Sequence, residues 1–379
     1  MADDKILDVN IPQKSHDDAE PEDTLLSGSA IESNSMDDFS DDTDTASATL
    51  GEKGTQNGRA EKKPVDRGSD VYLSTHPRLG SVVSAVLLSM IGLLATVGVF
   101  YVGVFTLTGQ YFDSWMWSDM SARFPSVEGF MPRLFTDSIW IIAVSVAMIA
   151  LAMLFAIFRK RFYTFGIITV YVVLAFGIAF VSKRVLPRPV LDPLIPDPAN
   201  SAPSGHTALT MIAGVALVMA VPRILRAVTA LLATAYTTAV AIMVIYDGWH
   251  RPTDSLTAIM LAGSLGLLAL AFTRASGMDE IGKRKSSVSV QIVATALIVL
   301  GLSAAAYGTY IVSQMYDIVQ YMPDALSVSG IYATIALISG MSAFMYGCIL
   351  ALRQATAAPL TRLGLLGAPP VPPKNFEAS

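Results

Sequence analysis

Two histidines and an aspartate lie at the edges of long apolar segments, where they could carry acid–base or nucleophilic chemistry. His206 and His250 are the two histidines that follow the first apolar segment. His250 and Asp254 are four residues apart, a spacing at which two side chains meet at the start of a helix. Asp254 could hold one ring nitrogen of His250 and leave the other as a nucleophile, while His206 protonates a leaving oxygen. Such chemistry needs no metal, and we expect no cofactor.

Small and basic residues near these histidines are typical of phosphate binding. Ser204 and Gly205 stand at an expected helix start, where free N–H groups and the positive end of the helix dipole attract an anion. Lysine and arginine neutralise phosphate oxygens, arginine in a forked geometry. The candidate cations are Lys183, Arg184, Arg188 and Arg251. The pattern therefore predicts phosphate chemistry.

The composition is that of a membrane protein. Of the 379 residues, 53% are hydrophobic and 15% are charged, and the mean hydropathy is +0.51. The lone cysteine, Cys348, excludes disulfides within the chain and a cysteine-rich metal site. About 20 apolar residues are enough to cross a bilayer as a helix. Eight runs of suitable length predict an all-α, polytopic helical bundle, with spans at 81–108, 137–158, 163–182, 204–221, 227–246, 253–273, 288–313 and 328–352.

The N-terminal part of the chain differs from this apolar region. The first 70 residues carry 18 acidic and 7 basic side chains, whereas the rest of the chain carries 13 and 19. This polar, acidic composition predicts disorder. Because the N-terminal sequence does not resemble a secretory signal peptide, we expect the first apolar segment to act as the targeting signal. The predicted units are an acidic tail at 1–75, a six-span core at 81–273, two added spans at 288–352 and a cytoplasmic tail at 353–379.

The distribution of basic residues predicts which face of the membrane carries the site. Short cytoplasmic loops retain lysine and arginine. With both termini in the cytoplasm, that side gathers Arg78, Arg159, Lys160, Arg161, Arg223, Arg226, Arg274, Lys283, Arg284, Lys285, Arg353 and Arg362. Counting spans then places His206, His250 and Lys183 together on the opposite face. We expect a multi-pass protein of the plasma membrane whose site faces away from the cytoplasm.

These segments resemble the signature motifs of the type 2 phosphatidic acid phosphatase (PAP2) superfamily over about residues 85–273. The run Pro203-Ser204-Gly205-His206 is similar to the whole second motif, and residues 246–254 follow the second half of the third. The resemblance implies that His250 accepts the phosphate, that Asp254 orients it and that His206 is the acid and base toward the leaving group. Ser204 and Gly205 would contact phosphate.

Two features depart from the family pattern. Four residues separate Lys183 from Arg188, where the first motif has six. The third motif opens with Ser-Arg, whereas this chain has Met243-Val244, so a phosphate-binding arginine is missing. Arg251, Arg184 or a residue from elsewhere in the chain could replace its charge. Restoring the arginine with Val244→Arg is expected to raise phosphate affinity.

The expected function is hydrolysis of a phosphate or diphosphate on a phosphatidate-like or polyprenyl lipid, through a phosphohistidine. One alternative is a PAP2-fold protein that binds or transfers phospholipid head groups without hydrolysis. A second is a transporter or channel, against which the lack of charged residues deep in the apolar runs argues. The expected partners are the lipid substrate and the membrane, with no nucleic acid. The spacing Gly347-x-x-x-Ala351 in the last span also allows a homo-oligomer.

Overall fold

A computed structural model gives the structure of the apolar part of the chain. It describes residues 77–125, 133–195, 200–274, 277–279, 287–319 and 321–358. All of them belong to one compact unit, residues 63–379. The predicted acidic tail 1–75 lies outside the described residues, as does most of the predicted C-terminal tail 353–379.

The regular elements among the described residues are all helices, and the predicted all-α polytopic bundle is confirmed. Seven of these helices are long and apolar enough to cross a membrane. The observed ends lie within five residues of the predicted ones. The elements are α2 (Leu79–Phe105), α3 (Leu107–Arg123), α4 (Arg133–Thr136), α5 (Ser138–Phe158), α6 (Phe162–Val185), α7 (Gly205–Ala220), α8 (Arg223–Tyr246), α9 (Pro252–Ala271), α10 (Val288–Met315) and α11 (Pro323–Ala357).

The helix α7 is shorter than a typical span and is mostly buried. Its 16 residues rise about 24 Å at 1.5 Å per residue, less than the roughly 30 Å of a bilayer core. It ends at Ala220 because Pro222 follows closely and cannot continue the hydrogen-bond ladder. Around it pack α5, α6, α8 and α9. These neighbours explain how a short apolar helix is accommodated at the centre of the bundle.

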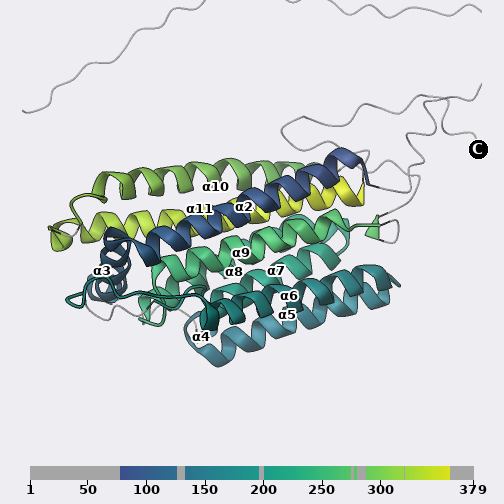
Figure 1. The fold of residues 1–379 in the computed structure, drawn as a ribbon. Coiled ribbons are helices and arrows are strands. Elements are labelled where there is room, and N and C mark those ends of the chain that lie inside the picture. The colour runs from purple at the N-terminus through teal and green to yellow at the C-terminus, as the bar shows by residue number, and fades with distance from the viewer. Residues whose placement is uncertain are drawn as a thin grey trace, which may run out of the picture. The chain divides into compact units, whose positions relative to one another are not determined.

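The last two helices pair closely and cover one side of this core (Figure 1). A Cβ at Gly301 of α10 or Gly340 of α11 would meet the backbone of the other helix, so the two glycines permit this approach. Gly347 likewise faces Ile298 of α10. The small residue Gly347 of the last span therefore serves packing between α10 and α11 within the chain.

The segment between the first two predicted spans contains a helix that apolar periodicity does not reveal. The helix α3 begins after Thr106, whose hydroxyl accepts a hydrogen bond from Gly109 N at 3.1 Å. Its buried side chains include Gln110, Asp113 and Ser114. A search for apolar runs misses α3 because polar groups make up much of its buried face.

At the other end of the bundle, α11 runs further than the apolar pattern predicts. Five residues of the predicted C-terminal tail, through Ala357, are helical. Arg353 is buried there, and its guanidinium donates to Met219 O at 3.1 Å and to Gly277 O at 2.9 Å. These carbonyl partners allow a charged residue to sit inside the last turns of the helix.

Candidate active site

His250, Asp254 and Ser201 form a hydrogen-bonded group at one end of the bundle. Asp254 lies in the first turn of α9, and His250 lies in the turn just before it. The Asp254 Oδ2 atom is 3.1 Å from His250 Nδ1 and accepts from Ser201 Oγ at 2.6 Å. It also accepts from Arg251 N at 3.2 Å. The predicted pairing of His250 with Asp254 is present, and Ser201 is an addition to it.

This network determines which nitrogen of His250 is available for chemistry. Ser201 has one hydroxyl proton, and the short contact assigns it to Asp254. The Ser201 Oγ atom is also 2.8 Å from His250 Nδ1, so Nδ1–H must be the donor in that contact. In the neutral ring Nε2 then carries a lone pair. This is the tautomer that a histidine nucleophile requires.

His206 stands on the first turn of α7, close to His250. The two ring centroids are 6.3 Å apart. His206 Nε2 is 2.7 Å from the hydroxyl of Ser138, the first residue of α5. Trp249 covers another side of His206, with its ring centroid at 5.4 Å. The structure therefore brings the two predicted histidines together. The ring of His206 is held by Ser138 of α5, a contact that the spacing of the motifs along the sequence does not predict.

The start of α7 offers backbone donors beside a cavity. Ser204 is the N-cap: its hydroxyl accepts from Thr207 N at 3.3 Å, and its own N–H donates to Asp254 O at 2.8 Å. A Cβ at Gly205 would meet nothing within 4 Å, so this point of the helix start is open. Gly205 and Lys183 line a cavity of about 440 Å³ together with the apolar side chains of α6. An anion held there would face a helix N-terminus and a lysine.

The three arginines predicted to bind phosphate make different contacts. Arg188 donates to the carbonyl oxygens of Ser182, Lys183, Leu186 and Ala202, at 2.6 to 3.3 Å, so it ties the loop between α6 and α7 to the end of α6. Arg184 lines the cavity, and its guanidinium lies 3.6 Å from the centre of the Phe180 ring. Arg251 is buried, 5.7 Å from the centre of the Trp117 ring.

Val244, at the family's arginine position, belongs to the apolar core. Its side chain is fully buried and packs with Ile141, Tyr236 and Val240. Its carbonyl oxygen accepts from Trp249 N and His250 N, both at 2.9 Å. An arginine in this cluster would be a buried charge among apolar side chains, which is strongly unfavourable. We therefore expect Val244→Arg to destabilise the protein rather than to raise its phosphate affinity.

The helix α3 braces the turn that carries His250. Trp117 Nε1 donates to Gly248 O at 2.7 Å, where Gly248 has a positive φ of 70° that a side chain would strain. Asp113 Oδ1 accepts from Thr253 N at 3.1 Å and from Thr253 Oγ1 at 2.9 Å. Burial, and then the nearby Asp254 carboxylate, raise the pKa of Asp113 to about 7.

Sequence reasoning missed Ser201, Ser138, Asp113 and Trp117. Ser201 lies just before the second motif in the chain and could have been suspected from this proximity. The other three come from α3 and α5, and no spacing along the chain relates those helices to the motifs. The described residues contain no group of histidine, cysteine and acidic side chains that could hold a metal ion.

One of three comparisons with known proteins supports the motif interpretation. Comparison with the curated proteins gave no match, and comparison with the solved structures gave none. Residues 181–278, which contain His206, His250 and Asp254, match the model of one family, described as the PAP2 superfamily. This match supports the membership of the chain in the PAP2 superfamily.

Proposed function

We propose that the protein is a membrane phosphatase that hydrolyses a lipid phosphate or diphosphate through a phosphohistidine on His250. The observation that carries the proposal is the network of Ser201, His250 and Asp254, which leaves Nε2 of His250 with a lone pair. The family match supports phosphatase-type chemistry on a lipid phosphate at this site. The seven apolar helices support a membrane protein.

In the first step, His250 Nε2 attacks phosphorus, a P–N bond forms and the P–O bond to the lipid breaks. Protonated His206 gives its proton to the leaving oxygen as that bond breaks. Asp254 stabilises the positive charge that develops on the His250 ring. This step produces a phosphohistidine and the dephosphorylated lipid. A lipid monophosphate leaves as the alcohol, and a lipid diphosphate leaves as the monophosphate.

In the second step, water attacks the phosphorus of the phosphohistidine. His206, now neutral, accepts a proton from this water, and the P–N bond breaks. Inorganic phosphate leaves, and His250 returns to its neutral form. Lys183 and the N–H groups at the start of α7 neutralise the phosphate oxygens in both steps.

A lipid substrate fits the surroundings of the cavity at Lys183. Phe176 and Phe180 of α6 line the same cavity as Lys183 and are 41% and 49% exposed. An acyl or prenyl chain could lie against these rings while its phosphate reaches the lysine. The site would then act on a phosphatidate-like or polyprenyl lipid without removing the chain from the bilayer. We place it at the non-cytoplasmic face of the plasma membrane, as the loop charges predict.

The test is phosphate release by the detergent-purified full chain, with chelator present, from phosphatidate and from polyprenyl diphosphate. We expect the wild type to release phosphate and His250→Ala to release none. The matched control is His16→Ala, which changes a histidine that precedes α2 in the sequence and should retain full activity. Phosphate release by His250→Ala at the wild-type rate would refute the mechanism. If the folded wild type released no phosphate from either substrate, the result would instead favour head-group binding or transfer without hydrolysis.

A further inference from the structure

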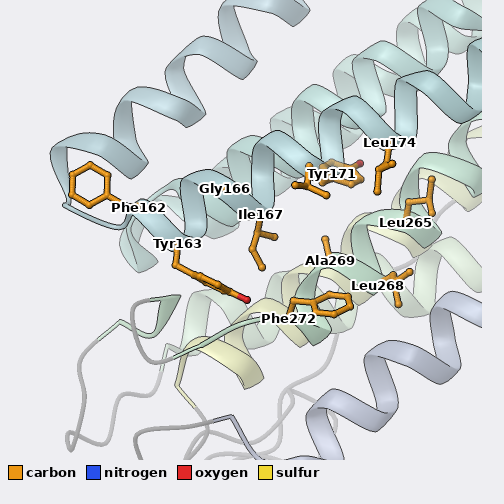
Figure 2. Close-up of a pocket in the computed structure, with 11 residues that line it drawn as sticks. Phe162, Tyr163, Gly166, Ile167, Tyr171, Leu174, Leu265, Leu268, Ala269 and Phe272 are labelled. Carbon is orange, nitrogen blue, oxygen red and sulfur yellow. The ribbon is translucent and has the colours of Figure 1, made fainter.

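A groove in the bilayer-facing side of the bundle lies between α6 and α9, at the end opposite His250. It has a volume of about 560 Å³, within the range of about 300–1,000 Å³ that ligand pockets span. In Figure 2, side chains from both helices face this common hollow. Val170 and Leu174 are 57% and 54% exposed, so the groove is open on the side where lipid would lie.

The dimensions of the groove suit one hydrocarbon chain. Along α6 it extends from Phe162 to Leu174, about 18 Å at 1.5 Å per residue. This is close to the depth of one leaflet, half of a hydrocarbon core about 30 Å thick. A Cβ at Gly166 would meet nothing within 4 Å, so the absence of a side chain at this position leaves space in the groove.

A cation stands at the outer end of the groove. Arg274 follows α9, and its guanidinium lies 4.7 Å from the centre of the Tyr163 ring, which lines the groove. The side chain is exposed. Among the residues that the structure describes, no carboxylate lies within ion-pair distance of Arg274. The guanidinium of Arg274 therefore stands exposed beside the ring that lines this end of the groove.

Among the described residues, this end of the bundle carries more positive than negative charge. The described carboxylate there, Asp279, pairs with Arg226 at 2.6 Å and lies 3.8 Å from Arg161 and 4.0 Å from Arg159. Arg353, bonded to Gly277 O, adds another cation. Several arginines therefore share one described carboxylate, and such a region attracts anionic groups.

We propose that this groove binds one anionic phospholipid of the leaflet opposite the active site, with an acyl chain between α6 and α9 and its phosphate at Arg274. The charge at the outer end selects an anionic head group over a zwitterionic one. The lipid is bound as a ligand rather than as the substrate, because the groove and His250 lie at opposite ends of α6 and α9.

The experiment is native mass spectrometry of the purified full chain with equal amounts of phosphatidylglycerol and phosphatidylcholine that carry the same acyl chains. We expect the wild type to retain more phosphatidylglycerol than phosphatidylcholine. A Cβ at position 166 meets nothing within 4 Å, so Gly166→Leu places its side chain in the groove and should lower the retention of both lipids below the wild-type level. Arg274→Gln should lower the ratio of phosphatidylglycerol to phosphatidylcholine about 5-fold, as expected for one surface cation.

Two matched controls separate the groove from general effects of the substitutions. Gly177→Leu makes the same change on the same helix, also with nothing within 4 Å, but outside the groove. Arg78→Gln removes an exposed cation at the same end of the bundle. Both controls should behave as the wild type.

Three results would overturn the proposal. One is equal retention of the two lipids by the wild type. The second is retention by Gly166→Leu at the level of Gly177→Leu, and the third is an unchanged lipid ratio in Arg274→Gln. None of them depends on phosphate release, so this proposal and the proposed hydrolysis can fail separately.

Discussion

At the scale of single residues, the hydroxyl of Ser201 links the two motif residues His250 and Asp254. It donates to Asp254 at 2.6 Å and lies 2.8 Å from His250 Nδ1. Asp254 is nearly fully buried, and a buried carboxylate needs such donors. Ser201 is therefore a positioning residue that holds the carboxylate and the ring in one arrangement.

We expect Ser201→Ala to lower kcat for phosphate release about 10- to 100-fold, the equivalent of about 1.5–3 kcal/mol for a hydrogen bond to a charged group. Asp254→Asn should cost more, about 10²- to 10⁴-fold, because it removes the orienting charge itself. The control is Ser182→Ala, whose hydroxyl donates to Ile178 O within α6. Steady-state rates of all three variants test this order, and a wild-type rate for Ser201→Ala would contradict the role.

At the scale of elements, α3 supports the site from outside the matched family segment. Trp117 binds the turn at Gly248, and Asp113 binds the first turn of α9 through Thr253. Both contacts span more than 100 residues of sequence. The helix thus holds the His250 turn in register with α9, and Asp113 makes this support sensitive to pH.

The carboxyl group of Asp113 changes its pKa on folding from 3.8 to about 7. Between these values the folded state binds a proton that the unfolded chain does not hold, so the contribution of Asp113 to stability falls as pH rises through this window. Asp113→Asn keeps an oxygen acceptor for Thr253 and does not titrate. We expect Tm measured from pH 5 to 8 in detergent to decline less in Asp113→Asn than in the wild type.

A second substitution separates the titration of the Asp113 carboxyl group from its hydrogen bonds to Thr253. Asp113→Ala also removes the titrating group, but it leaves the Thr253 N–H and hydroxyl without their acceptor. Its phosphate release should therefore fall while that of Asp113→Asn is retained. Equal pH slopes of Tm in the wild type and Asp113→Asn would show that Asp113 does not titrate in this way.

At the scale of the whole molecule, the two ends of the bundle have different chemistry. One end carries the histidines and the loop of Ser201, and the other gathers the arginines around Asp279. The charge rule for short loops assigns the arginine end to the cytoplasm. The proposed phosphatase would then act on the outer leaflet, and the proposed lipid groove would open to the inner one.

Cysteine labelling of intact cells tests this orientation, because the natural Cys348 is buried and can be replaced by alanine. Leu194 is 86% exposed in the loop at the site end, and Arg78 is exposed at the start of α2 at the other end. We expect a membrane-impermeant maleimide to label Leu194→Cys without lysis and Arg78→Cys only after permeabilisation. The reverse labelling pattern would place the site on the cytoplasmic face of the membrane.

The sequence alone determined the polytopic helical class, the extents of the apolar helices and the residues that resemble the family motifs. This follows because crossing a bilayer requires long apolar helices, whose length and composition are visible in any single segment. The pairing of His250 with Asp254 was predictable for a similar reason, since residues four apart on one helix turn are neighbours whatever surrounds them.

Only the tertiary structure decided which other groups complete the site. Asp113, Trp117 and Ser138 reach it from α3 and α5, and sequence separation gives no information on which helices pack together. The roles of Arg188 and Val244 also depended on packing: the arginine binds loop carbonyls, and the valine fills an apolar cluster. Contacts between helices are set by the fit of whole surfaces, which a motif of a few residues does not contain.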